Sequence, residues 1–179
     1  MAKKKKAGIK VFTWIMIAFM AVGLVLTVVG IFTDWTTTKG EAIGGIVSTE
    51  GNTTLQDYFD QQKDSVELLG EEKGKIEYFD ATYAFAWLAL IGSAVALAGY
   101  LLGGLLKLNL FKTIGMLGGI VALLTGVLTA IFTYMMCKEL SADAGIVGSV
   151  TTTLAVGCYL TMIGGIVSGG SAIVAKLKK

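Results

Sequence analysis

The chain has 179 residues and contains no histidine, no proline and no arginine, and its only cysteines are Cys137 and Cys158. Without histidine it lacks the side chain that most often acts as a general base near neutral pH or as a zinc ligand. It also lacks a serine elbow, a phosphate-cradling glycine loop and a calcium-loop pattern. The sequence therefore predicts a protein that is not an enzyme and has no catalytic residue, cofactor or metal site.

Two cysteines are too few for a disulfide framework. Cys137 and Cys158 are interpreted as small apolar packing residues, and a bridge between them would require that the helix faces carrying them meet.

Charge is also scarce, because only 16% of the residues are charged, against roughly a quarter in soluble domains. Four stretches of 23 to 32 residues carry no charge at all: 11–33, 81–106, 113–137 and 144–175. A helix of about 20 apolar residues crosses the hydrocarbon core of a bilayer. The sequence predicts four transmembrane helices, at 11–33, 81–106, 113–137 and 149–175, with Ser149 and Thr151–Thr153 at the outer end of the last.

The lysines predict the orientation of these helices. Ten lysines and no acid lie in segments 1–10, 107–112 and 176–179, whereas segments 34–80 and 138–148 hold all thirteen acids and five lysines. Short lysine-rich segments stay in the cytoplasm, so both termini are expected there. The membrane that the protein spans is expected to be the plasma membrane of the cell. The run at the N-terminus is interpreted as a topology signal rather than a nucleic-acid site. The residues taken as topology signals are Lys3, Lys4, Lys5, Lys6, Lys107, Lys112, Lys178 and Lys179.

Glycines recur at helical spacing in the apolar stretches. Small residues let membrane helices approach closely, since lipid provides no hydrophobic force between them. The candidate packing residues are Gly23, Gly30, Gly99, Gly103, Gly115, Gly119, Gly165 and Gly169. Their spacing leaves open whether they serve the bundle itself or an oligomer. No ionisable residue falls inside a predicted span, which argues against a pump, carrier or voltage-gated channel.

Segment 34–80 has the character of a small folded unit, with eleven acids against four lysines. Its pattern predicts a strand at Ile43–Thr49, a helix capped by Thr53 or Thr54 and ended by Gly70, and a second strand at Lys75–Phe79. The helix carries an apolar stripe of Leu55, Phe59, Val66 and Leu69. This stripe either packs on the protein's own strands or the membrane surface, or docks a partner.

The candidate partner-binding residues of this helix are Leu55, Asp57, Tyr58, Phe59, Asp60 and Asp64. The three aspartates share one helical face and are interpreted as a solvated acidic surface, with weak cation binding as the alternative. Among the aromatic residues, Trp35, Tyr83 and Tyr134 are expected at the outer membrane boundary.

The layout of four spans, cytoplasmic ends, a first outer segment of about fifty residues and a short second one resembles that of the claudin and peripheral-myelin-protein tetraspans. Trp35 stands where those families carry a tryptophan after the first span, although the Gly-Leu-Trp motif and the cysteine pair of their first outer loop are absent. The expected fold is an all-α membrane protein. It has an antiparallel four-helix transmembrane bundle and a small α+β extracytoplasmic cap.

Three functions remain open at this level. The first is a structural or interaction scaffold that displays the acidic cap to a membrane or envelope protein, or to a second copy of itself. The second is an accessory subunit of a transporter or channel. The third is an oligomeric pore, which needs several copies to build a polar lumen. Each places the chain in contact with the lipid bilayer and none involves nucleic acid.

Overall fold

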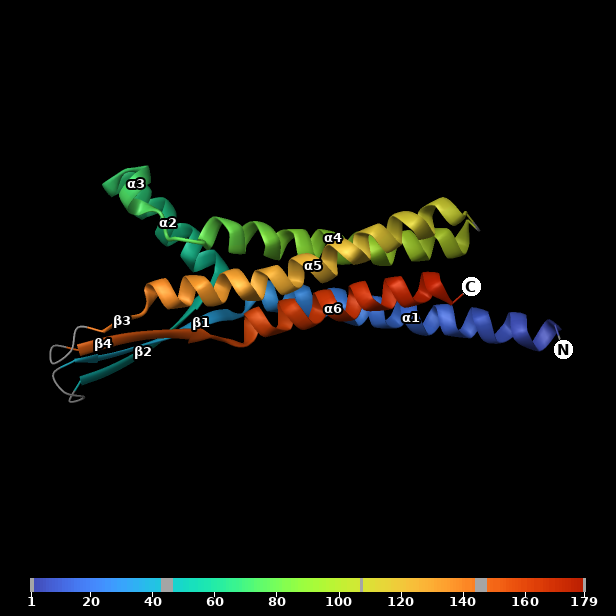
Figure 1. The fold of residues 1–179 in the computed structure, drawn as a ribbon, viewed down its shortest axis with the longest axis horizontal. Coiled ribbons are helices and arrows are strands. Elements are labelled where there is room, and N and C mark those ends of the chain that lie inside the picture. Colours follow the sequence, from blue (N-terminus) through green and yellow to red (C-terminus); the bar gives the residue numbers. More distant parts are fainter. Residues whose placement is uncertain (1, 43–46, 107, 144–147, 179) are drawn as a thin grey trace.

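The computed structural model describes residues 2–42, 47–106, 108–143 and 148–178. Its four long helices are α1 (Ala2–Phe32), α4 (Phe79–Leu105), α5 (Asn109–Leu140) and α6 (Val156–Leu177). All four are long and apolar enough to cross a membrane. They form an antiparallel bundle in which α4 packs on α5, α5 on α6 and α6 on α1, with both termini at the same end (Figure 1). The prediction of four apolar helices is confirmed.

The other end of the bundle carries a sheet and two further helices. Strands β1 (Asp34–Ala42) and β2 (Val47–Thr54) follow α1, and helices α2 (Leu55–Leu69) and α3 (Glu71–Gly74) come before α4. Strands β3 (Ala142–Asp143) and β4 (Gly148–Leu154) lie between α5 and α6. The antiparallel sheet has the order β2-β1-β4-β3, and it extends away from the bundle in a different direction from the α2–α3 arm (Figure 1). Both outer connections therefore build one cap.

The predicted helix of the cap is confirmed. Thr54 is the N-cap of α2, and its hydroxyl accepts a hydrogen bond from the Asp57 backbone N–H. Gly70 ends the helix with φ at +83°, a conformation that favours glycine. The cap position and the terminating glycine therefore set the bounds of α2, as the sequence indicated.

The strand predictions for segment 34–80 are partly wrong. Within Ile43–Thr49, residues 43–46 lie outside the described residues, and Val47–Thr49 begin β2. Lys75–Phe79 is not a strand, because Tyr78 takes a left-handed conformation and Phe79 opens α4 with its ring buried. Burial of the Phe79 ring favours the helical start of α4 more than the weak apolar–polar alternation of Lys75–Phe79 favours a strand. The longest strand, β1, was not predicted.

The predicted fourth span, 149–175, begins too early. Residues up to Leu154 form β4, and α6 starts only at Val156. Thr151, Thr152 and Thr153 pair with Lys39, Thr38 and Thr37 of β1, as suits β-branched side chains. Helix α5 continues to Leu140, so the outer connection, expected at 138–148, starts three residues later than predicted. The 22 residues of α6 still suffice for a span.

The glycines singled out in the sequence lie where helices meet. A Cβ on Gly23 would stand 2.6 Å from the backbone nitrogen of Ser168, and one on Gly30 would stand 2.6 Å from that of Thr161. Gly99 and Gly103 of α4 face α5, where Gly115 faces Tyr100. Gly119, Gly165 and Gly169 lie in the α5–α6 contact. All eight serve contacts inside the bundle, which accounts for their spacing without an oligomer.

Candidate functional site: the cap and its junction with the bundle

The cap is joined to the bundle by a single apolar cluster, called the junction below. It contains buried residues from α1, β1, α2, α4, α5 and α6, namely Ile31, Trp35, Leu55, Tyr58, Phe79, Ala86, Met136 and Cys158. Large side chains from six elements thus interlock in one place, which sets the position of the cap.

Trp35 lies at the centre of the junction and is 0% exposed. Its indole Nε1 donates to the carbonyl of Gly30 at 2.7 Å, and its own carbonyl accepts from the N–H of Ala155 at 2.8 Å. Trp35 therefore ties the end of α1 to the start of α6. Its side chain is buried in the junction and does not face outward, and its level at the membrane boundary stays a prediction. Tyr134 is exposed, and Tyr83 is half-buried.

Two of the predicted partner-binding residues are not accessible. Leu55 and Tyr58 are buried in the junction, and the Tyr58 hydroxyl shares a 2.8 Å hydrogen bond with the Thr36 hydroxyl. Burial raises the pKa of Tyr58 above its ordinary value. Both residues must be removed from the set of candidate contacts, since a helix lying on its own protein has to bury one side.

Asp57 belongs to the helix cap. Its carboxylate accepts hydrogen bonds from the Thr54 backbone N–H at 3.0 Å and from the Thr54 hydroxyl at 2.7 Å. These two bonds, the backbone one first, hold the pKa of Asp57 below its ordinary value. Asp57 is exposed, but its hydrogen bonds with Thr54 cap the N-terminus of α2.

The accessible part of the candidate set is therefore the outer face of α2. Asp60 and Asp64 are exposed, as is Glu67 one turn further on. Phe59 is 40% exposed, and its ring stacks on Tyr83 with the centroids 5.2 Å apart. At the tip, Leu68 and Leu69 point away from the protein, so the predicted stripe is buried only at its first turn. The exposed surface of α2 is acidic with an apolar tip.

Gln62 holds the middle of α2 against the chain that enters α4. Its Nε2 donates to the Asp80 carboxylate at 2.7 Å, and its Oε1 accepts from the Ile76 backbone N–H at 3.0 Å. The arm formed by α2 and α3 is thereby fixed at its base and along one side.

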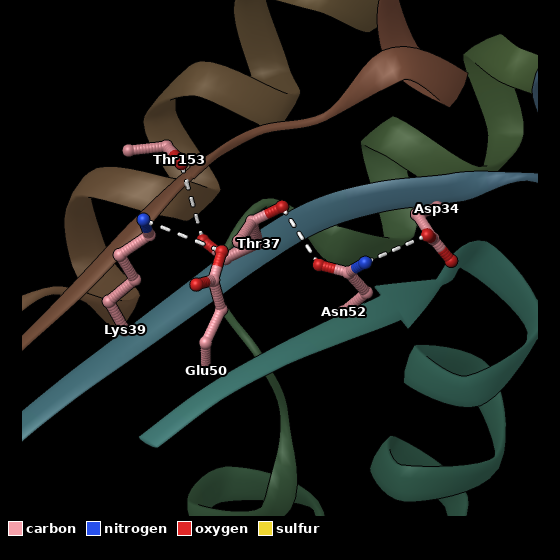
Figure 2. A network of polar contacts seen from close by, with 6 residues as sticks. All are labelled: Asp34, Thr37, Lys39, Glu50, Asn52 and Thr153. Carbon is pink, nitrogen blue, oxygen red and sulfur yellow. Dashed lines mark hydrogen bonds and ion pairs between the residues drawn. The ribbon is translucent and has the colours of Figure 1, made fainter. Parts of the chain in front are cut away.

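The exposed face of the sheet carries a polar network (Figure 2). Asn52 donates to the Asp34 carboxylate at 3.0 Å and accepts from the Thr37 hydroxyl at 3.0 Å. The Thr153 hydroxyl donates to the Thr37 carbonyl at 3.3 Å. Lys39 and Glu50 lie 3.4 Å apart and form the one ion pair found among the described residues. These contacts tie β2, β1 and β4 together through side chains as well as backbone.

A groove of about 510 Å³ lies where this face meets the bundle, and it is called the Asp34 groove below. Its polar wall is formed by Thr33, Asp34, Thr37 and Asn52, and its apolar wall by Leu154, Ala155, Val156 and Tyr159. A second groove of about 420 Å³ lies on the other side of Tyr159, between the end of α5 and β4, and includes Lys138.

Within residues 2–42, 47–106, 108–143 and 148–178, no three side chains among Asp, Glu, Cys and His are grouped so as to hold a metal ion. Asp57, Asp60 and Asp64 therefore do not gather into a cation site. Cys137 and Cys158 are both buried free thiols.

No protein-family model matches the chain, and no curated protein matches it. The geometry is therefore the only guide to function.

Sequence reasoning missed the second half of the sheet, although a signal for it was present. Thr36–Thr38 and Thr151–Thr153 are the two threonine triplets that pair across β1 and β4. Two β-branched runs of equal length, each next to an apolar stretch, indicate strands that can meet above the bundle.

Proposed function

We propose that the four long helices span the plasma membrane and that the chain is a non-enzymatic scaffold which displays its cap outside the cell. The observation that carries the membrane part is the distribution of side-chain size, which is the reverse of that in a soluble bundle. Glycine, alanine, serine and threonine occupy most of the buried positions of the four long helices, whereas Trp14, Phe19, Ile91, Leu124 and Ile163 point outward. A soluble bundle would bury the large apolar residues instead. A coat of lipid gives them an apolar surrounding.

The proposed orientation places both termini in the cytoplasm. Lys112, Lys176 and Lys178 lie at the end of the bundle that carries the termini, together with the first turns of α1 (Figure 1). There Lys178 lies 4.1 Å from the centroid of the Phe12 ring, and Lys176 donates to the Thr113 hydroxyl at 2.7 Å. The acidic cap occupies the opposite end. Retention of lysine on the cytoplasmic side supports this orientation.

Cysteine labelling tests this topology. On a background in which both native cysteines are replaced by serine, Asp60→Cys should react with a membrane-impermeant maleimide in intact cells. Lys178→Cys should react only after the cells are opened. Labelling of Lys178→Cys in intact cells would reverse the proposed orientation, and equal labelling of both in intact cells would exclude the four-span arrangement.

The proposed task of the cap is to contact a membrane or envelope protein, or a second copy. The exposed side of α2 supports this, because Asp60, Asp64 and Glu67 form an acidic face and Leu68, which is 83% exposed, gives it an apolar tip. Contacts of this composition combine electrostatic steering with a small desolvated centre. The arm that carries them is held in place by the junction and by Gln62.

Cross-linking in native membranes tests the task of the cap. The combination Asp60→Asn, Asp64→Asn and Glu67→Gln should lower the yield of cross-linked complexes severalfold. Its control is the combination Glu41→Gln, Glu77→Gln and Glu139→Gln, which removes the same charge from exposed positions outside α2, in β1, before α4 and at the end of α5. If both combinations behave like the unaltered chain, α2 is not the contact surface.

The accessory-subunit alternative predicts a different result. A stoichiometric complex with a transporter or channel would survive gentle detergent extraction and would depend on the bundle rather than on α2. The pore alternative predicts conductance when the purified protein is added to planar bilayers. The claudin-like layout belongs to the same proposal, and the four helices with a folded outer unit support it.

A further inference from the structure

We infer that the Asp34 groove binds the headgroup of a phospholipid that carries a primary ammonium group, in the outer leaflet of the membrane. This inference rests on the proposed four-span arrangement. It assigns the groove a ligand that the scaffold proposal does not require.

The height of the groove in the fold is the first argument. Asp34 directly follows the uncharged stretch 11–33, and Val156 is the first residue of α6. Phe32 and Val156, both strongly exposed, mark the upper limit of the apolar helix surface. Above them begins the polar face of the sheet. In a bilayer this level is the boundary between acyl chains and headgroups.

The two walls of the groove match the two parts of a lipid. Leu154, Ala155, Val156 and the ring of Tyr159 offer apolar contact of the kind that acyl chains need. Asp34, Thr37 and Asn52 line the same groove and supply its polar groups. A water-soluble ligand would make no favourable contact with this apolar wall, which continues into the proposed lipid-facing surface of α6.

The charge of the groove selects the headgroup. Asp34 is its one ionisable carboxylate, and no lysine contributes to its lining. One carboxylate oxygen, Oδ2, accepts from Asn52 at 3.0 Å (Figure 2). Asn52 is in turn held by Thr37, so the carboxylate is oriented by two neighbours. An oriented anion near the headgroup level complements an ammonium group, and a primary ammonium can donate charge-assisted hydrogen bonds to it.

The phosphate of the same headgroup has a counterpart beside Asp34. Ala155 and Val156, where α6 begins, line the groove, so the positive end of the helix dipole lies next to it. A headgroup with both charges therefore fits better than a bare cation or an anionic lipid. A choline headgroup has the same two charges but no N–H to donate.

Native mass spectrometry of the full chain in mild detergent tests the inference. The chain is titrated separately with phosphatidylethanolamine, phosphatidylcholine and phosphatidylglycerol of the same acyl composition. Phosphatidylethanolamine should bind about tenfold more tightly than the other two, the difference expected for one charge-assisted hydrogen bond. Asp34→Asn should abolish this preference. Asp60→Asn, which removes the same charge on α2, should leave it unchanged.

A second variant keeps the test independent of the folding of Asp34→Asn. Val156→Lys adds a tethered ammonium group to the wall of the groove, where it should compete with the headgroup and remove the preference. Equal binding of all three lipids, or a preference that survives both groove variants, overturns the inference. Displacement of the lipid by equimolar soluble phosphoethanolamine would also overturn it, since the ligand would then be a free ammonium compound.

The topology experiment with Asp60→Cys and Lys178→Cys separates the two proposals. If labelling shows four spans and the lipids bind without preference, only the lipid inference fails. If the four-span pattern itself is absent, the membrane proposal fails and the inference falls with it.

Discussion

The α1–α6 contact and the junction lie next to each other along the same helices, yet opposite kinds of residue build them. In the α1–α6 contact, Gly23 and Gly30 face Gly164 and Thr161 so closely that the two main chains touch. Five residues beyond Gly30 stands Trp35 of the junction, where the largest buried side chains are aromatic. The proposed membrane arrangement explains the difference. Lipid is as apolar as leucine, so helices in it gain from close backbone approach, whereas water around the cap rewards burial of large rings.

Removing the largest junction side chain should have the greatest effect. Trp35→Ala deletes a fully buried ring and its hydrogen bond to Gly30, and it should lower the free energy of unfolding by about 3–5 kcal/mol. Thermal unfolding in mild detergent measures the change. Trp14→Ala is the control, because Trp14 is exposed on α1, and it should change stability by about 0.5 kcal/mol at most. Equal effects of the two variants would contradict the distinction between junction and bundle surface.

Adding one methyl group should disturb the bundle contact more gently. In Gly164→Ala the new Cβ would stand 2.6 Å from the carbonyl oxygen of Gly23. The helices must then separate, which should cost about 1–3 kcal/mol. The control is Gly170→Ala on the same helix, where no atom lies within 4 Å of the added Cβ. Thermal unfolding of both variants in mild detergent measures the difference. A similar loss of stability in Gly164→Ala and Gly170→Ala would mean that close approach of the helices does not stabilise the α1–α6 contact.

The sequence could predict the features that depend on local pattern. It could not predict those that depend on contacts between segments far apart in the chain. The four helices and α2 were foreseen from uncharged length and from Thr54 and Gly70. The pairing of β1 with β4 joins residues more than a hundred positions apart, such as Thr38 and Thr152. The two threonine runs indicate strands, but no local pattern encodes which strands pair. For the same reason the pattern of α2 alone cannot exclude Leu55 and Tyr58 as partner contacts. Their burial depends on Trp35, Phe79 and Met136, which other elements supply.

Loss of the α2 cap should weaken the arm without affecting the bundle. Thr54→Ala removes the hydroxyl that accepts from the Asp57 backbone N–H at 3.1 Å, at a cost of about 1 kcal/mol to the start of the helix. Hydrogen exchange should accelerate in α2 alone, while α5 and α6 keep their protection. Thr151→Ala, at an exposed position of β4, is the matched control. Faster exchange throughout the bundle would show that arm and bundle unfold together.

The smallest expected effect is a pH dependence of the same cap. Hydrogen bonds from Thr54 hold the pKa of Asp57 below its ordinary value of 3.8. The unfolded chain therefore binds this proton more readily than the folded one, so the carboxylate contributes to α2 stability above pH 3.8 and ceases to do so as pH falls through the lowered pKa. A carboxyl-carbon NMR titration reads the pKa directly, and amide exchange in α2 should rise over the same interval. Asp57→Asn should remove this rise and Asp60→Asn should preserve it. Titration of Asp57 at or above 3.8 would mean that the cap is not formed in solution. Because Asp57 is fully exposed to solvent, its protonation should loosen the first turn of α2 and leave the junction below it intact.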